Sequence, residues 1–465
     1  MLFIHHPPSY DKERNYIYDV IFREFLGLEY RGVVEDRSDI CVRMADDNQE
    51  TLTISDKFFA VSRSEWMQSS SLPLQPLPKW DIEEKEIQSL NVNGSLPIIY
   101  GNTPEEGTYL SCSDQGITIA VDIFGSAFFM LTQYEEIVKS DRDNHDRFPA
   151  QSSLAYREGF LERPIINEYV EILWWALKKL WPGLQRKQRH SRIIPTHDVD
   201  SPFGSLFLSP YAMGRTLAGD LLKRRNLTAF MKRITNLYKV KTGNVLADDH
   251  YTFDLIMDIS EKHNLTSSFY MMEAQGQSQL DGNYPLDHPY IIKLMQSIHN
   301  RGHEIGLHPS YVSYQDGQEV KREAERLLSL CHKHGIQQSH IGGRQHYLRW
   351  RCPDTWQHYE DAGLVYDTTL SFADHIGFRC GVCYEYPVFN VLTGEVLKLK
   401  ERPLIVMECS ALDSRYMNLS HEEALERIIN LKNICLNYNG DFVLLWHNSR
   451  FIDIKEIELY KAILL

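Results

Sequence analysis

The sequence predicts an α/β protein whose second part forms a parallel sheet that closes, or nearly closes, into a barrel. From residue 192 onward, short apolar segments typical of buried strands alternate with segments that have the apolar spacing of helices. Parallel strands need long crossover connections, so this alternation favours parallel pairing. The seven expected strands span residues 192–198, 266–271, 303–308, 341–347, 364–370, 404–409 and 441–447.

The segments between these strands support helical crossovers. Ala324, Leu327, Leu328 and Cys331 recur at the spacing of one helix face, and Gly335 then provides a stop signal. A similar apolar spacing over residues 424–429 precedes the expected last strand. An insert over residues 203–250 lacks strand signals and is predicted to be helical and basic. The loop 371–400 is long and contains glycine, which makes it a candidate wall of a site.

The first 190 residues predict a separate α/β domain of unknown role, with residues 191–465 forming the barrel. Strand-like segments at 40–44 and 116–123 mix with helical patterns at 128–138 and 164–180. The helix at 164–180 has more apolar surface than a small domain requires, so part of it should pack against the barrel. This domain either narrows the site and selects the substrate or only covers apolar barrel surface. Residues 139–147 are strongly polar and suit either a recognition loop or, as we favour, a solvated loop.

Composition limits the classes of function. Hydrophobic residues make up 43% of 465 residues and charged residues 24%, as in ordinary globular proteins. The net charge of −14 disfavours generic binding to nucleic acid or to an anionic membrane surface. No apolar run approaches 18 residues, and the N-terminus lacks the pattern of a secretory leader, so we expect a cytoplasmic protein without membrane insertion. The pair Cys380 and Cys383 is a weak metal or redox signal, for which a structural role is favoured. The oligomeric state is not predicted.

Polar side chains follow several of the expected strands. Asp198 and Asp200, two residues apart on an extended chain, should point to the same side. Two carboxylates in one pocket repel, so one should bind a cation or take up a proton. A helix cap beside a surface acid is the simpler alternative. Further polar groups end other expected strands: His308, then Arg344 with Gln345, His346 and Tyr347, then Trp446 with His447. Their convergence on one barrel face favours a catalytic site.

These residues resemble the polysaccharide deacetylase superfamily, the NodB-homology group of carbohydrate esterases. The resemblance covers residues 192–465 and includes Asp198-Val199-Asp200, His303-Glu304-Ile305-Gly306 followed by His308, Arg344 followed by an aromatic residue, and Leu444-Leu445-Trp446-His447. It implies a distorted seven-stranded (β/α) barrel. The form of the motifs is similar to that of a bacterial branch with an extra N-terminal domain, which is associated with surface-polysaccharide biosynthesis.

The sequence departs from the family pattern at one metal ligand. The family places a second metal histidine four residues after the first, where this chain has Val312. His303 is a poor substitute, because its five-residue offset from His308 puts it on the opposite face of a strand. His346 ends the next strand, about 5 Å away. We therefore expect Asp200, His308 and His346 to hold a divalent metal, with zinc as the first candidate.

The resemblance implies a metal-dependent hydrolase that removes acetyl from an N-acetylated sugar or polysaccharide precursor. Asp198 would act as the base, Arg344 would orient Asp198, and His447 would protonate the leaving amine. Tyr347 and Trp446 are expected to contact substrate, with Tyr347 a candidate for steadying the oxyanion. Trp446, like Trp350 and Trp356, either stacks on a sugar ring or lies in the core. Two alternatives remain open. One is a catalytically inactive barrel that binds glycan or a partner enzyme, and the other is a hydrolase of a non-sugar amide.

Overall fold

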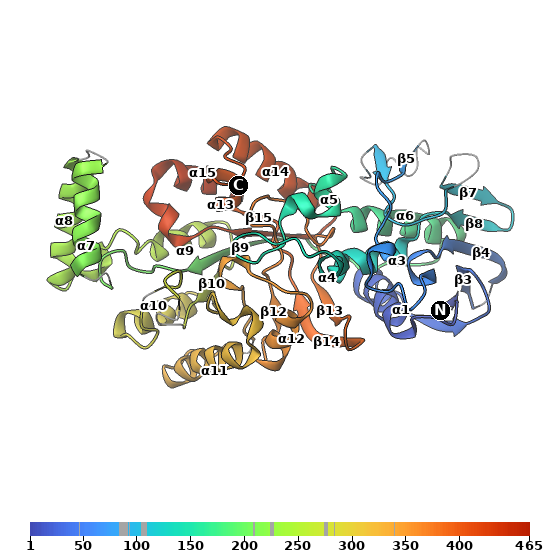
Figure 1. Ribbon diagram of the computed structural model, residues 1–465, viewed down its shortest axis with the longest axis horizontal. Coiled ribbons are helices and arrows are strands. Elements are labelled where there is room, and N and C mark those ends of the chain that lie inside the picture. The colour runs from blue at the N-terminus through green and yellow to red at the C-terminus, as the bar shows by residue number, and fades with distance from the viewer. Residues whose placement is uncertain are drawn as a thin grey trace.

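The computed structural model describes residues 1–465 apart from 46, 83–91, 93, 104–108, 208–209, 224–226, 274–277, 283 and 339. The molecule is elongated (Figure 1). An N-terminal sheet with its helices lies at one end, a parallel sheet surrounded by helices lies in the middle, and a pair of helices projects at the other end. No helix in the described part of the chain is both long enough and apolar enough to span a membrane.

The N-terminal half contains a six-stranded mixed sheet in the order β2-β1-β3-β4-β8-β7. Its strands are β1 (Leu2–His6), β2 (Tyr30–Val34), β3 (Asp39–Met44), β4 (Asp47–Ser55), β7 (Leu110–Ser113) and β8 (Gly116–Ile119). Helices α1 (Asp11–Tyr18), α3 (Ile123–Leu131), α4 (Tyr134–Val138), α5 (Leu154–Arg157) and α6 (Ile165–Leu180) accompany it, and a π-helical turn, η1 (Asp19–Leu26), continues α1. A small hairpin pairs β5 (Lys79–Asp81) with β6 (Ser95–Pro97).

The strand expected at 40–44 is present, and the helix expected at 128–138 is divided in two. Gln133, between α3 and α4, has a left-handed backbone with φ of 53°, which ends the first helix. The strand-like segment 116–123 supplies β8 and then the start of α3, whose first turn is capped by the Asp122 carboxylate accepting the Gly125 N–H at 2.7 Å.

The second half contains a five-stranded parallel sheet in the order β11-β10-β9-β16-β15. Its strands are β9 (Arg192–Val199), β10 (Ser268–Met271), β11 (Glu304–Leu307), β15 (Val406–Met407) and β16 (Asp441–Leu445). All residues of β10, β15 and β16 are buried, as expected for parallel strands covered on both faces. The covering helices are α9 (Phe253–Lys262), α10 (Pro289–Asn300), α11 (Gly317–Lys333), α12 (Asp354–Asp361), α13 (Glu408–Leu412), α14 (His421–Asn437) and α15 (Ile454–Leu464).

The expected seven-stranded barrel requires a correction. The segment expected as the fourth strand, 341–347, contributes only Gly343, which bridges Leu307 on one side and Asp367 on the other. It then forms a short 3₁₀ turn, η8 (His346–Leu348). The fifth segment shortens to β12 (Tyr366–Asp367). The seven segments keep their parallel order. The Arg402 and Leu404 N–H groups donate to the carbonyls of Asp367 and Leu370 at 2.8 and 3.2 Å, which connects the fifth segment to the sixth. No regular strand ladder joins β12 to β15 among the described residues, so a closed seven-stranded barrel is not confirmed.

The second half of the expected loop 371–400 is a β-hairpin that the sequence did not predict. Strands β13 (Tyr386–Asn390) and β14 (Glu395–Glu401) pair antiparallel, and β14 pairs with β12. The alternating burial of β14 shows that only one face packs inward. This hairpin contacts the N-terminal half, because Tyr16 stacks on Phe389 at 4.8 Å and its hydroxyl donates to the Pro387 carbonyl at 2.9 Å.

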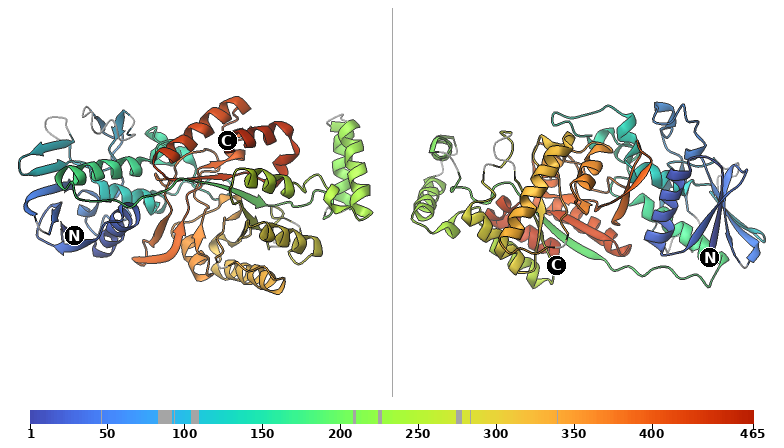
Figure 2. Two further views of the ribbon diagram at one scale, coloured as in Figure 1. Left: turned by 180° about the vertical axis from the view of Figure 1, so that it is seen from behind. Right: turned by 90° about the horizontal axis from the view of Figure 1, so that it is seen from below.

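Helix α6 joins the two halves. Twelve of its 16 residues are buried. The Ile166 N–H donates to the Gly381 carbonyl at 2.9 Å, and Asn167 Oδ1 accepts the Cys383 N–H at 3.1 Å. Figure 2 shows the linker between α6 and β9 running extended along one side of the molecule. These contacts are those expected of a helix that packs against a neighbouring unit.

Candidate active site

A pocket of about 350 Å³ opens where the parallel strands end. Asp198 and Asp200 lie at the carboxyl end of β9, His308 follows β11, and His447 follows β16. His346 comes from the turn η8 beyond the Gly343 bridge. Because neighbouring parallel strands end at the same edge, groups more than 100 residues apart in sequence meet here. Further lining residues are Arg147, Tyr347, Leu348, Met407, Cys409, Asp413, Arg415, Tyr416, Ser449 and Arg450.

Asp200, His308 and His346 form a group with the geometry of metal ligands. One donor atom from each lies within 4.8 Å of the other two. Asp200 Oδ1 is 3.3 Å from His308 Nε2 and 3.7 Å from His346 Nε2. Ligand atoms about 2.1 Å from a tetrahedral ion are about 3.4 Å apart, so these separations fit a divalent metal. Asp200 Oδ1 and His308 Nε2 are also buried without a hydrogen-bond partner in the described part of the chain. A bound ion would satisfy both atoms.

Each histidine of this group is oriented through its other ring nitrogen. His308 Nδ1 lies 2.5 Å from the Arg344 carbonyl oxygen, and His346 Nδ1 lies 2.8 Å from Asp281 Oδ1. Both Nδ1 atoms therefore donate, which leaves both Nε2 atoms as acceptors directed at Asp200. Such partners fix the tautomer and the ring orientation of metal-binding histidines. His303 faces elsewhere, since its Nδ1 accepts the Ser267 N–H at 3.0 Å.

Asp198 is held by a buried arginine. Arg344 Nη1 donates to Asp198 Oδ1 and to Thr196 Oγ1, both at 2.9 Å, while Arg344 Nε donates to the Thr368 carbonyl at 2.9 Å. Arg344 is fully buried and Asp198 nearly so. The charge-assisted bond from the guanidinium fixes the position of the Asp198 carboxylate. Asp198 Oδ2 lies 3.8 Å from His308 Nε2, so Asp198 borders the ligand group without belonging to it.

His447 borders the ligand group from another strand. Its Nε2 lies 3.7 Å from Asp200 Oδ2, and its Nδ1 lies 2.5 Å from Glu408 Oε1. Burial lowers the pKa of His447, but the Glu408 carboxylate outweighs this effect and raises the pKa well above its ordinary value. Burial raises the pKa of Glu408, and the imidazolium of His447 more than reverses that shift. The arrangement thus favours the protonated form of His447.

The charges of the ligand group are mutually dependent. Burial alone would raise the pKa of Asp200, but His346, His308 and His447 together lower it well below the ordinary range. Burial lowers the pKa of His308, and the carboxylates of Asp198 and Asp200 reverse this to a net increase. The site therefore stabilises the ionised Asp200 carboxylate next to a positive charge, and a metal cation would supply that positive charge.

The two residues expected to contact substrate differ in their placement. Tyr347 lines the pocket and is partly exposed. Its backbone is left-handed with φ of 63°, an arrangement that costs a tyrosine roughly 1 kcal/mol or more. Trp446 requires a correction, because its side chain is fully buried and packs against Tyr460 with ring centroids 5.5 Å apart. Side chains alternate along an extended segment, so Trp446 points away from the pocket that His447 enters. Trp350 and Trp356 are likewise buried and belong to the core.

The polar segment 139–147 belongs to the rim of this pocket. Arg147 lines it, and Arg147 Nη1 donates to the Tyr347 carbonyl at 2.9 Å. His145 Nδ1 lies 3.1 Å from the Tyr311 hydroxyl, and the His145 carbonyl accepts from Arg349 Nε at 2.8 Å. The favoured interpretation of this segment as a solvated loop is wrong at His145 and Arg147. The sequence signal for a role at the site was that histidine and arginine alternate with acidic residues in this segment.

Two acids that orient the histidines were not predicted. Glu408 ends the sixth expected strand, so its position in sequence could have identified it. Asp281 lies in the connection after β10, where an isolated acid has no distinctive sequence pattern. The candidate cysteine pair, Cys380 and Cys383, is buried with both thiols free.

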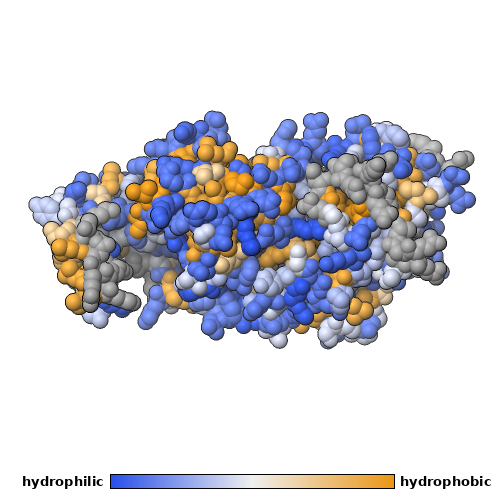
Figure 3. Space-filling model, turned by 90° about the horizontal axis from the view of Figure 1, so that it is seen from above, coloured by the Kyte–Doolittle hydropathy of each residue, from blue (hydrophilic) through white to orange (hydrophobic). Residues whose placement is uncertain are grey.

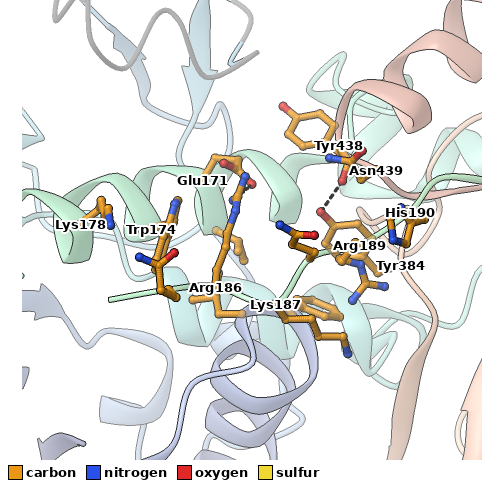
Figure 4. Close-up of a pocket in the computed structure, with 15 residues that line it drawn as sticks. Glu171, Trp174, Lys178, Arg186, Lys187, Arg189, His190, Tyr384, Tyr438 and Asn439 are labelled. Carbon is orange, nitrogen blue, oxygen red and sulfur yellow. Dashed lines mark hydrogen bonds and ion pairs between the residues drawn. The ribbon is translucent and has the colours of Figure 1, made fainter. Parts of the chain in front are cut away.

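A second cavity of about 440 Å³ lies away from this chemistry, between α6, the linker and the segment after α14 (Figure 4). Its lining includes the ion pair Arg186–Glu171 at 2.6 Å, and the Tyr384 hydroxyl donates to the Tyr438 carbonyl at 2.7 Å. Lys178 Nζ donates to the carbonyls of Pro182 and Leu184. The cationic groups here serve mainly to hold the linker.

Comparison with known proteins gives a family match in the N-terminal part of the chain. Residues 2–182 match a family described as a family of unknown function (DUF7033). No curated protein matches the chain.

Solved structures resemble the chain distantly. A protein described as a polysaccharide deacetylase from Mycobacterium smegmatis is 15% identical, with 60% of this chain and 83% of that chain covered and a TM-score of 0.37. The PuuE allantoinase is 11% identical, with 60% and 84% covered and a TM-score of 0.36. A polysaccharide deacetylase from Bacillus cereus is 13% identical, with 60% and 86% covered and a TM-score of 0.27. All three TM-scores are below 0.5, so the function assigned below depends on the geometry of the site.

Proposed function

We propose that the protein is a metal-dependent hydrolase that removes acetyl groups from an N-acetylated sugar or sugar polymer. The observation that supports this proposal most strongly is the convergence of Asp200, His308 and His346, with two buried donor atoms that lack hydrogen-bond partners among the described residues. Two imidazoles and one carboxylate suit catalytic zinc and also other divalent metals. His346 replaces the ligand that Val312 cannot provide, which argues against an inactive barrel.

The surrounding residues provide the acid and the base that amide hydrolysis requires. A divalent ion held by Asp200, His308 and His346 would supply Lewis-acid activation of a carbonyl and of water. Asp198, held in position by Arg344, accepts the proton of the attacking water. His447, kept protonated by Glu408, donates a proton to the leaving nitrogen. The two groups approach the ligand group from different strands, so one serves the nucleophile and the other the leaving group.

The sugar in this proposal comes from the resemblance of the motifs to the deacetylase superfamily. The partly exposed Tyr347 ring at the pocket rim offers an aromatic face on which a sugar could pack. Hydrolysis of a non-sugar amide would use the same acid and base, so the substrate panel has to include both classes.

The metal site is tested by measuring metal content. Purified wild type should contain about one divalent ion per chain, and His346→Ala should lose most of it, because one of three protein ligands is removed. His303→Ala is the matched control, since that histidine lies outside the group and should leave metal content unchanged. Equal metal content in wild type and His346→Ala would contradict the assignment of His346.

The reaction is tested by acetate release from N-acetylglucosamine oligomers and from non-sugar acetamides. Wild type loaded with metal should release acetate from the sugars, and Asp198→Asn and His447→Ala should each lower turnover by roughly 10²–10⁴. Binding of the oligomers without any acetate release would instead support the inactive barrel. Release from acetamides alone would support the non-sugar hydrolase.

A further inference from the structure

The insert between β9 and α9 forms a projecting pair of helices with an exposed apolar stripe. Helices α7 (Pro210–Ala218) and α8 (Leu227–Lys241) stand clear of the parallel sheet at one end of the molecule (Figure 1). On α8 the exposed residues Leu227, Met231, Ile234 and Tyr238 follow one another at intervals of four, three and four. This spacing places them along a single helix face.

The stripe faces solvent because the opposite face of α8 makes the internal contacts. Val240 is buried, and Asn236 Nδ2 donates to Asp249 Oδ1 at 2.6 Å. Leu227 is 63% exposed, Met231 54% and Tyr238 70%. Tyr211 and Leu222, at 80% and 79%, add exposed apolar surface to the same insert, and orange side chains gather at this end of the molecule in Figure 3. Such a concentration on one helix pair marks an interaction surface.

The charge of the insert is opposite to that of the rest of the chain. Residues 210–247 contain eight Lys and Arg residues and one acidic residue, a net charge of +7, in a chain whose net charge is −14. Lys239 and Lys241 are exposed at the end of α8 that follows the stripe. An apolar stripe bordered by basic residues is the pattern of a helix that lies in the interface of an anionic bilayer.

We propose that this helix pair, α7 and α8, docks the protein on the surface of a membrane that contains anionic lipids. Helix α8 has 15 residues, about 22 Å of helix, which is too short and too charged to span a bilayer. It suits an orientation parallel to the surface, with the stripe among the acyl chains and the lysines at the headgroups. The net charge of −14 for the whole chain disfavours generic binding to an anionic surface, but it does not reflect the positive charge concentrated in residues 210–247.

Two other occupants fit less well. A symmetric dimer through the stripe would bring two copies of residues 210–247, each with a net charge of +7, together, which is repulsive. Nucleic acid would engage the basic residues but would leave the apolar stripe exposed to water. A lipid surface satisfies both the charge and the stripe.

The base of the insert is fixed to the rim of the catalytic pocket. The Asp248 carboxylate accepts the N–H groups of Gly204 and Ser205 at 2.6 and 2.8 Å. Asn448, which follows His447, donates to the carbonyls of Ser201 and His250, both at 3.0 Å. Docking would therefore hold the pocket at a set position relative to the lipid surface.

The test is flotation of the full-length protein with lipid vesicles at about 100 mM salt. Vesicles of phosphatidylcholine with phosphatidylglycerol should carry wild type upward, and pure phosphatidylcholine should not. Replacing Leu227, Met231, Ile234 and Tyr238 together by Ser should abolish flotation. Lys239→Glu with Lys241→Glu should reduce partitioning by more than about tenfold. The matched controls are Leu74→Ser with Ile454→Ser, both exposed elsewhere, and Lys262→Glu with Lys398→Glu, which change the net charge equally.

Both control pairs should float like wild type. Failure of wild type to float with anionic vesicles would overturn the proposal, as would equal losses in the Lys262 and Lys398 control. Light scattering after gel filtration tests for a dimer, and a binding assay with duplex DNA tests for nucleic acid. If wild type does not bind vesicles, two results would overturn the proposal in favour of another occupant. One is self-association that only the fourfold Ser variant abolishes. The other is DNA binding that only the Lys239→Glu and Lys241→Glu variant abolishes. All variants act away from the catalytic residues, so their acetate release from a soluble substrate should match wild type.

Discussion

A buried acid beside the active-site loop makes the stability of the protein depend on pH. Glu323, on α11, is fully buried, and its Oε2 accepts the Ser310 N–H at 2.9 Å. Its Oε1 lacks a hydrogen-bond partner among the described residues. Burial raises the pKa of Glu323 to about 8, and the bonds from Ser310 only partly oppose this. Folding therefore favours the protonated acid.

The raised pKa fixes the sign of the effect. The stabilising contribution is fully present below the ordinary pKa of about 4.5 and is lost as pH rises through about 8. Each pH unit between these values costs up to about 1.4 kcal/mol, so raising the pH from 5 to 8 removes at most about 4 kcal/mol. Glu323→Gln retains the acceptor for the Ser310 N–H and cannot ionise, so its unfolding free energy should be flatter over this range.

The assay is urea unfolding of wild type and Glu323→Gln, followed by tryptophan fluorescence at pH 5, 6, 7 and 8. The difference in unfolding free energy should increasingly favour the variant as pH rises. Glu325→Gln, on the exposed side of the same helix, is the control and should track wild type. If the difference in unfolding free energy between wild type and Glu323→Gln does not change with pH, Glu323 ionises normally, and the reasoning from burial fails.

Three further changes test the site and the core. Arg344→Lys should lower kcat at least about tenfold and leave the far-ultraviolet circular dichroism unchanged. The reason is that a lysine cannot reach Thr196, Asp198 and Thr368 together. An undiminished kcat would show that Arg344 does not position Asp198. Arg147→Ala should raise KM by roughly tenfold, because the Tyr347 carbonyl loses its donor, and an unchanged KM would make this contact structural only. Trp446→Phe should leave KM within about twofold and lower stability by roughly 1–2 kcal/mol, since the indole is in the core; a large rise in KM would restore Trp446 to the substrate site.

The fold was predictable where apolar periodicity is strong and uncertain where strands are short. The segment that forms β16 has an uninterrupted apolar run over 442–445, and the helix α11 has clear one-face spacing. The segment 341–347 has two glycines and then polar residues, and it forms one bridge and a turn in place of a strand. The β13–β14 hairpin was missed because β14 alternates apolar residues with lysine and glutamate, a pattern that also suits an exposed loop.

The site was predictable where its residues terminate strands. Asp198, Asp200, His308 and His447 follow buried strands directly, and the structure brings them together with His346 and Arg344. Asp281 and Arg147 could not be found in the same way, because each comes from an irregular segment whose path depends on tertiary contacts. Trp446 adjoins His447 in sequence, but successive residues of an extended segment face opposite sides, so its indole lies in the core while His447 enters the pocket.

The contribution of His145 and Arg147 to the pocket rim also bears on how this protein can evolve. Each contacts a tyrosine of the second half, His145 meeting the Tyr311 hydroxyl and Arg147 the Tyr347 carbonyl. A gene fusion that joined this second half to a different N-terminal module would lose both contacts at once. Inheritance of the two halves should therefore be linked, and we expect His145 and Tyr311 to be exchanged together among relatives. The two halves would then form one evolutionary unit although each contains its own sheet.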